Sequence, residues 1–157
     1  MPWNPDQYHK FQSQRAAPFD DLLALVEKRP QLKVVDLGCG TGELTRRLAD
    51  SLPNSDMLGL DNSPQMLERA SVHAGSGLRF QLGDQSALSG DWDLILSNAA
   101  LQWTENHESL IPNLFNHLRP NGQIAVQIPS NHEHASHRII REVAARGEIP
   151  GLAKASW

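Results

Sequence analysis

The stretch Val34-Val35-Asp36-Leu37-Gly38-Cys39-Gly40-Thr41-Gly42 decides the fold of this chain. Its first half is apolar and begins with two β-branched residues, which is typical of a buried strand. Its second half places three glycines in five residues just before a segment of helical period, and such a turn lets a ligand touch the backbone. The stretch therefore predicts a strand, a tight turn and a helix, with a nucleotide-type ligand at the turn.

The rest of the chain alternates short apolar runs with segments of helical period. The runs are bounded by Gly, Pro, Asp or Asn, and they predict five strands at residues 32–37, 56–60, 78–82, 92–97 and 123–128. Strands that alternate with helices and carry continuous apolar runs indicate a mostly parallel sheet with helices on both faces. The predicted fold class is therefore α/β, a doubly wound Rossmann-like domain.

Three helices are predicted between these strands. Leu44, Leu48 and Leu52 mark the first, while Ser63-Pro64 supplies an N-cap and a first-turn proline for the second, which runs to about residue 74. The third carries an apolar stripe of Leu110, Ile111, Leu114, Phe115 and Leu118. Pro112 is expected near its start, and Pro120-Asn121-Gly122 is expected to end it before the fifth strand.

Two more helices are expected outside this alternating core. Residues 17–28 would cover the sheet with an apolar face of Leu22, Leu23, Leu25 and Val26, and residues 136–146 would form another helix downstream. Residues 147–157 are too short and too broken to hold further strands. We therefore expect one domain over residues 1–157: an N-terminal lid with helices at 1–30, a ligand-binding core at 31–130, and the truncated start of a C-terminal substrate region at 131–157.

Composition narrows the class of protein. The 157 residues carry 14 Lys and Arg against 18 Asp and Glu, a net charge of −4, which argues against a basic nucleic-acid-binding domain. No stretch approaches the ~20 apolar residues that span a bilayer, and the polar N-terminus does not resemble a signal peptide. The single cysteine, Cys39, suits a reducing compartment. We expect a cytoplasmic protein that binds neither nucleic acid nor membrane.

Charge predicts which ligand the glycine turn accepts. Asp36 precedes the turn and Glu43 follows it, and both carboxylates would repel a pyrophosphate. Asp61 ends the second predicted strand, 19 residues after Gly42, where α/β nucleotide sites place a carboxylate for ribose hydroxyls. Asp84 ends the third, where it can accept a hydrogen bond from adenine N6. Either acid alone could be a helix cap or turn residue, but together they indicate a cationic ligand that contains adenosine.

These residues give the chain its family resemblance. The sequence resembles the class I S-adenosylmethionine-dependent methyltransferases over residues 33–128. The resemblance rests on the segments Asp36-Leu37-Gly38-Cys39-Gly40-Thr41-Gly42, Asp61-Asn62-Ser63-Pro64-Gln65-Met66, Gly83-Asp84 and Leu118-Arg119-Pro120-Asn121-Gly122-Gln123. It implies S-adenosylmethionine as the cofactor and S-adenosylhomocysteine as the product.

The resemblance also implies a role for each matching residue. Asp36 and Gly38 would meet the methionyl amino group, with Gly40 and Gly42 completing the turn. Asp61 would bind the ribose, Asn62 and Met66 would surround the adenine, and Asp84 with Gln85 would meet its edge. Asn98, after the fourth strand, would lie beside the donor methyl group.

Three further segments resemble, within that superfamily, the trans-aconitate methyltransferases. They are Tyr8-x-x-Phe11-x-x-x-Arg15-x-x-Pro18, Leu96-Ser97-Asn98-Ala99-Ala100-Leu101-Gln102-Trp103 and Ala125-Val126-Gln127-Ile128-Pro129. This implies methyl ester formation on a carboxylate of a small polyacid such as trans-aconitate. A carboxylate is ionised at pH 7 and needs no general base, and the sequence shows no obvious base. It also lacks the Asn-Pro-Pro-Tyr segment and the Pro-Cys nucleophile of enzymes that methylate nucleic-acid bases.

Several residues are candidates for binding the acceptor substrate. Asn98, Gln102 and Trp103 are expected near the acceptor, although Trp103 could equally pack on the sheet. Tyr8, Phe11 and Arg15 recur at helical spacing and would form either a substrate lid or a packing face. Arg15 is the cation there that suits a carboxylate, and His137 is a further candidate for substrate contact.

Two further patterns concern a metal site and a nucleophile, and two functions other than polyacid methylation stay open. His132, His134 and His137 form His-x-His-x-x-His, but only Glu133 adds a nearby carboxylate, so we predict no metal. Cys39 is expected to serve as a small side chain within the turn and not as a nucleophile. The open alternatives are a methyltransferase for another carboxylate, such as a malonyl thioester, and a truncated cofactor-binding module without catalysis. The sequence leaves the oligomeric state open.

Overall fold

The computed structural model describes residues 12–130, Ile139 and Glu142. Five strands form its sheet: β1 (Lys33–Leu37), β2 (Asp56–Asp61), β3 (Leu78–Leu82), β4 (Trp92–Asn98) and β5 (Leu118–Gln127). Four α-helices accompany them, α2 (Gln12–Leu25), α3 (Glu43–Ser51), α4 (Pro64–Ala70) and α5 (His107–Asn116), with short 3-10 turns η1 (Ser71–His73), η2 (Gln85–Ala87) and η3 (Leu101–Trp103).

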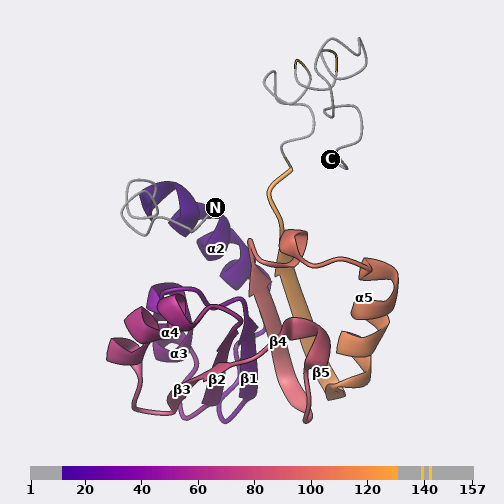
Figure 1. Cartoon of the computed structure of the whole chain (residues 1–157). Coiled ribbons are helices and arrows are strands. Elements are labelled where there is room, and N and C mark those ends of the chain that lie inside the picture. The colour runs from indigo at the N-terminus through magenta and orange to yellow at the C-terminus, as the bar shows by residue number, and fades with distance from the viewer. Residues whose placement is uncertain (1–11, 131–138, 140–141, 143–157) are drawn as a thin grey trace.

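The strands are all parallel and lie in the order β3-β2-β1-β4-β5. Figure 1 shows α3 and α4 on one side of this sheet and α5 on the other. Two apolar clusters fill the layers between them. One joins α2 and α3 to the sheet through Phe19, Leu22, Leu48, Leu52 and their neighbours, and the other joins α5 through Leu110 and Leu114. The predicted doubly wound α/β class is therefore confirmed.

Local signals fix where two of the helices begin. Gly42, in the left-handed conformation, is the N-cap residue of α3. The Ser63 side chain accepts a hydrogen bond from the Met66 backbone N–H at 3.4 Å, and Pro64 occupies the first turn of α4. The predicted cap is confirmed, and η1 extends the helical segment to His73, close to the expected end.

Helix α2 differs from the prediction at both ends and on its buried face. It begins at Gln12, five residues early, so Pro18 lies inside it. It ends at Leu25, because the backbone of Glu27 instead pairs with the side chain of Gln123. Leu22 and Val26 are buried as expected, but Leu25 is 83% exposed and Phe19, which was not predicted, is fully buried. The apolar face is therefore rotated away from Leu25.

The end of α5 and the start of β5 were also predicted wrongly. Pro112 lies inside α5 rather than near its start. The helix ends before Pro120, because the carbonyl of His117 accepts a hydrogen bond from Trp92 N–H at 2.8 Å. Leu118 consequently pairs with Trp92 as part of β5, and residues 119–122 form an irregularity before Gln123 pairs with Leu94.

The remaining predictions about chain organisation concern residues that lie mostly outside the described part of the chain. The predicted helix at 136–146 lies outside the described residues except for Ile139 and Glu142, which are helical. Within the described part of the chain, no helix is both long and apolar enough to cross a bilayer.

Candidate functional site

The strand order changes direction between β1 and β4, and parallel α/β folds bind ligands at the carboxyl ends of the strands at this point. The glycine turn that follows β1 lies there. Its first two residues are held to the neighbouring strand, since Gly38 N–H and Cys39 N–H both donate to the carbonyl of Leu60, at 2.8 and 3.1 Å. The predicted turn therefore stands at the edge of the sheet where a ligand is expected.

The three glycines of the turn all have positive φ, at +75°, +56° and +80° for Gly38, Gly40 and Gly42. Two of them are also needed for packing. A Cβ on Gly38 would lie 2.2 Å from Cβ of Ala100, and a Cβ on Gly42 would lie 2.9 Å from Cβ of Ala70. The protein's own packing thus requires these glycines, so they indicate a ligand only together with the polar groups around them.

Asp61, at the end of β2, holds the turn in place. One carboxylate oxygen, Oδ2, accepts a hydrogen bond from Gly40 N–H, and the other, Oδ1, accepts one from Ser63 N–H, both at 2.9 Å. Each oxygen keeps a further lone pair, because a carboxylate offers about four acceptor positions. Asp61 can therefore act as a turn residue and as an acceptor for ligand hydroxyls at the same time.

Asp36 is the buried acid of the site, with 4% of its surface exposed. Its Oδ2 accepts a hydrogen bond from Thr45 Oγ1 at 2.6 Å. Burial raises the pKa of Asp36 from 3.8 to about 6, the Thr45 hydrogen bond lowers it, and the nearby charge of Asp61 raises it. The carboxylate is consequently ionised at pH 7 but close to the range where it gains a proton.

This raised pKa predicts a pH-dependent loss of stability. Because the folded chain holds the Asp36 proton more tightly than the unfolded chain, ionisation costs stability as pH rises from about 4 to about 6. Relative to Asp36→Asn, the wild-type free energy of unfolding should fall by about 2–3 kcal/mol between pH 4 and pH 7. Urea denaturation of both proteins at the two pH values measures this difference. A constant difference would show that folding does not raise the pKa of Asp36.

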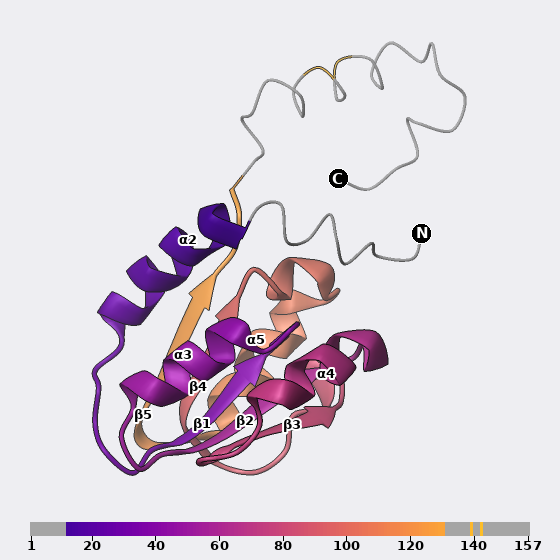
Figure 2. The same cartoon turned by 90° about the vertical axis from the view of Figure 1, so that its left-hand side faces the viewer.

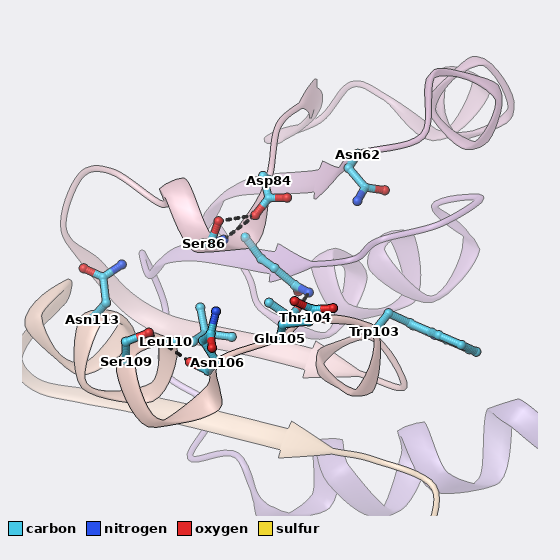
Figure 3. A pocket seen from close by; sticks show the side chains of 11 residues that line it. Asn62, Asp84, Ser86, Trp103, Thr104, Glu105, Asn106, Ser109, Leu110 and Asn113 are labelled. Carbon is cyan, nitrogen blue, oxygen red and sulfur yellow. Dashed lines mark hydrogen bonds between the residues drawn. The ribbon is translucent and has the colours of Figure 1, made fainter. Parts of the chain in front are cut away.

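Asp84 and Gln85 follow β3 and line a pocket of about 670 Å³. Asp84 is exposed and accepts hydrogen bonds from the backbone and the hydroxyl of Ser86, which lower its pKa. The Gln85 side chain donates to Thr104 Oγ1 and so links the segment after β3 to the one after β4. Figure 3 shows Asp84, Asn62 and Trp103 around this pocket, with Ser109 and Asn113 of α5 at its far side.

Asn98 ends β4, and Gln102 and Trp103 follow it in η3. Trp103 does not pack on the sheet, because 70% of its surface is exposed and it lines the pocket. The amide oxygens of Asn98, Gln102 and Gln85 are buried and accept no hydrogen bond from the protein. Three unpartnered acceptors at and just beyond the carboxyl ends of β3 and β4 indicate that this region meets hydrogen-bond donors supplied from outside the chain.

The other predicted site residues divide into three groups. Met66 and Glu43 lie in the first turns of α4 and α3, near the turn but not among the residues that line the pocket. Cys39 is buried, and burial raises the pKa of its thiol, which agrees with a packing role. Tyr8, Phe11 and His137 lie outside the described residues, as do His132 and His134; Arg15 belongs to α2, but its side chain is not described.

Several residues of the site were missed in the sequence, among them two threonines that contact predicted site residues. Thr45 contacts Asp36, and Thr104 contacts Gln85. Thr45 had a detectable signal, since it lies three residues before Leu48 and therefore on the buried face of α3. A polar residue on such a face needs a buried partner. Thr104 had no comparable signal, because its contact depends on how two loops meet.

The parallel sheet, the acid-flanked glycine turn and the adjoining pocket are those of a class I methyltransferase domain. A family model described as "Methyltransferase domain" matches residues 28–154. The chain belongs to this methyltransferase family.

Comparison with individual proteins agrees with this assignment. The chain is 54% identical over 144 residues to trans-aconitate 2-methyltransferase of Deinococcus radiodurans, covering 92% of this chain and 56% of that protein. It is 43% identical over 148 residues to the protein of the same name from Variovorax paradoxus, covering 92% and 57%. The chain thus spans somewhat more than half the length of these curated relatives.

Solved structures support the fold. An S-adenosylmethionine-dependent methyltransferase from Mesorhizobium loti matches with a TM-score of 0.64 and 31% identity, covering 70% of this chain and 52% of that one. A coclaurine N-methyltransferase bound to N-methylheliamine and S-adenosylhomocysteine matches with a TM-score of 0.64 and 21% identity, covering 71% and 35%.

Proposed function

We propose that this chain is the cofactor-binding part of an S-adenosylmethionine-dependent O-methyltransferase that esterifies a carboxylate of a small polyacid, with trans-aconitate as the substrate. The proposal rests above all on the glycine turn, which lies between two acids and beside a pocket that bears a third. The identity to relatives named trans-aconitate 2-methyltransferase supports the choice of acceptor.

The site's chemistry suits this cofactor, which supplies an electrophilic methyl group on a positively charged sulfur. Its ammonium would meet the Asp36 carboxylate and the unpartnered Asn98 oxygen at the turn, beside Gly38. Its ribose hydroxyls would donate to Asp61, which keeps free lone pairs. Its adenine would occupy the pocket lined by Asn62, Asp84 and Gln85, near Met66.

Methyl transfer to a carboxylate requires alignment of the reacting atoms rather than a general base. A carboxylate acceptor is already ionised at neutral pH and can attack the methyl group without first losing a proton. Holding the acceptor oxygen in line with the methyl group can contribute up to ~7–11 kcal/mol. In this proposal Asn98, Gln102 and Trp103 bound the acceptor space, and Tyr8, Phe11 and His137 also contact the acceptor.

The positive charge for the acceptor is proposed to come from Arg15. Figure 2 shows the N-terminal end of α2 beside the carboxyl end of β5, so the first turn of α2 lies at the same edge of the sheet as the glycine turn. A guanidinium binds a carboxylate through two parallel hydrogen bonds. Residues 1–30 would then act as a lid, residues 31–130 as the cofactor-binding core and residues 131–157 as part of the substrate region, within a cytoplasmic enzyme.

Cofactor choice tests the proposal first. We expect the chain to bind S-adenosylmethionine and S-adenosylhomocysteine but not NAD, because Asp36 and Glu43 disfavour a pyrophosphate at the turn. Isothermal titration calorimetry with the three ligands measures this directly. NAD binding without a signal from the other two would contradict the proposal.

The acceptor is tested by methyl transfer in the full-length natural protein. We expect a base-labile methyl ester on trans-aconitate, and we expect Arg15→Ala to raise the KM for trans-aconitate by about 10- to 100-fold with a smaller effect on kcat. Labelled cofactor with a panel of polyacids, malonyl thioesters, amines and nucleic acids gives the readout. Arg79→Ala, at an exposed ion pair with Asp56, is the matched control. Stable label on an amine or a nucleic acid would refute the proposal.

A further inference from the structure

Ala99, the first residue after β4, has a backbone conformation that its side chain disfavours. Its φ is +53°, in the left-handed region, where an L-residue with a Cβ is strained. Such strain persists only where the surrounding structure imposes it, and it gathers at functional sites. Ala99 lies directly between Asn98, which is proposed to meet the cofactor, and Ala100, which contacts the glycine turn at Gly38.

Two hydrogen bonds hold Ala99 from opposite sides. Its N–H donates to the carbonyl of Gln127 in β5 at 2.8 Å. Its own carbonyl accepts from the side-chain Nε2 of Gln102 at 2.7 Å. The first bond extends the pairing of β4 with β5, whereas the second is a side-chain contact that no regular element requires. Gln102 is therefore the group specifically placed to stabilise the left-handed residue.

In this orientation the Gln102 amide leaves its oxygen without a partner in the protein. Its Oε1 is buried and has no hydrogen-bond partner in the protein. Rotating the amide by half a turn would give that position the Nε2 group but would place Oε1 against the Ala99 carbonyl, two acceptors face to face. This orientation keeps the bond to Ala99 and leaves Oε1 free to accept a hydrogen bond from a donor outside the chain.

The conformation of Ala99 determines how the segment after β4 lies against the glycine turn. Ala100 is in close contact with the glycine turn, since a Cβ on Gly38 would lie 2.2 Å from its own Cβ. Asn98 carries one of the unpartnered buried oxygens. If φ of Ala99 returned to negative values, the chain direction from Asn98 to Ala100 would change, and Ala100 would leave its position against Gly38.

We propose that Gln102 is a positioning residue that holds Ala99 in its left-handed conformation and thereby fixes Asn98 and the Gly38–Ala100 contact for cofactor binding. This role rests on the proposed function, because it assumes that S-adenosylhomocysteine binds at the glycine turn. It assigns to Gln102 a task on the cofactor side, in addition to its place near the acceptor.

A rescue experiment separates this role from ordinary packing. Gln102→Met keeps the length of the side chain and removes the donor, and we expect it to weaken S-adenosylhomocysteine binding by about two- to tenfold. Ala99→Gly removes the Cβ that makes a positive φ costly. The double variant Gln102→Met/Ala99→Gly should therefore recover most of the lost affinity, measured by calorimetry with thermal unfolding as a check of folding.

The control replaces an alanine whose φ is negative. Ala74 has φ −66°, so Gln102→Met/Ala74→Gly should bind as weakly as Gln102→Met alone. An unchanged affinity in Gln102→Met, or a double variant with Ala99→Gly that gains nothing, would overturn the positioning role while wild-type binding stands. Failure of the wild-type chain to bind S-adenosylhomocysteine would instead refute the proposed function, and the positioning role with it.

Discussion

Asp61→Ala is expected to weaken binding of S-adenosylhomocysteine by about 10- to 100-fold, the range for losing a hydrogen bond to a charged acceptor. Two effects act in the same direction. The substitution removes the acceptor proposed for the ribose hydroxyls, and it releases the backbone N–H groups of Gly40 and Ser63 that Asp61 holds at 2.9 Å. Calorimetric titration measures the change in affinity.

Two further variants locate the origin of this effect. Asp61→Asn keeps one acceptor oxygen but turns an NH₂ group toward one of the two backbone donors, so it should fall between wild type and Asp61→Ala. Asp91→Ala removes an exposed acid just before β4, at the opposite end of the strand from the site, and should change nothing. Wild-type affinity in Asp61→Ala would show that Asp61 is only a turn residue.

Gly38→Ala is expected to destabilise the chain by about 2–5 kcal/mol and to abolish cofactor binding. Strain at a positive φ contributes about 1–2 kcal/mol, and overpacking contributes about 1–3 kcal/mol. The overpacking arises because the new Cβ would lie 2.2 Å from Cβ of Ala100. Urea denaturation gives the change in the free energy of unfolding, and calorimetry gives the loss of binding.

A matched glycine and a compensating variant separate the two contributions. Gly90 has φ +85°, but the atom nearest to a Cβ there would be Nζ of Lys33 at 3.7 Å, so Gly90→Ala should show the conformational cost alone. Gly38→Ala/Ala100→Gly removes the clash and should recover about 1–3 kcal/mol. Equal destabilisation in Gly38→Ala and Gly90→Ala would show that Ala100 moves aside freely.

The predictions that succeeded depend on signals within a few residues of each other. The strand before Gly38, the cap at Ser63 and the positions of Asp61 and Asp84 at strand ends follow from local sequence, and the structure has all of them. Parallel strands then place their carboxyl ends at one edge, so the acids were expected to gather there. Their roles toward a cofactor remain proposals.

The predictions that failed depend on contacts distant in sequence. Leu118 continues the stripe of α5 by spacing, yet it joins β5 because His117 is already bonded to Trp92. Leu25 belongs to an apolar segment, but the face of α2 that meets the sheet is the one that carries Phe19 and Leu22. The contacts of Gly38 with Ala100 and of Gln85 with Thr104 likewise join segments that only the tertiary fold brings together.

The pairing of Glu27 with Gln123 sets an order of events during synthesis. The Glu27 N–H donates to Gln123 Oε1 at 2.8 Å and the Glu27 carbonyl accepts from Gln123 Nε2 at 3.0 Å, across 96 residues of sequence. At a synthesis rate of about 5–20 residues per second, Gln123 follows Glu27 by roughly 5–20 s. The C-terminal end of α2 therefore lacks this partner until the β5 segment that carries Gln123 has been made, so the contact forms late in synthesis.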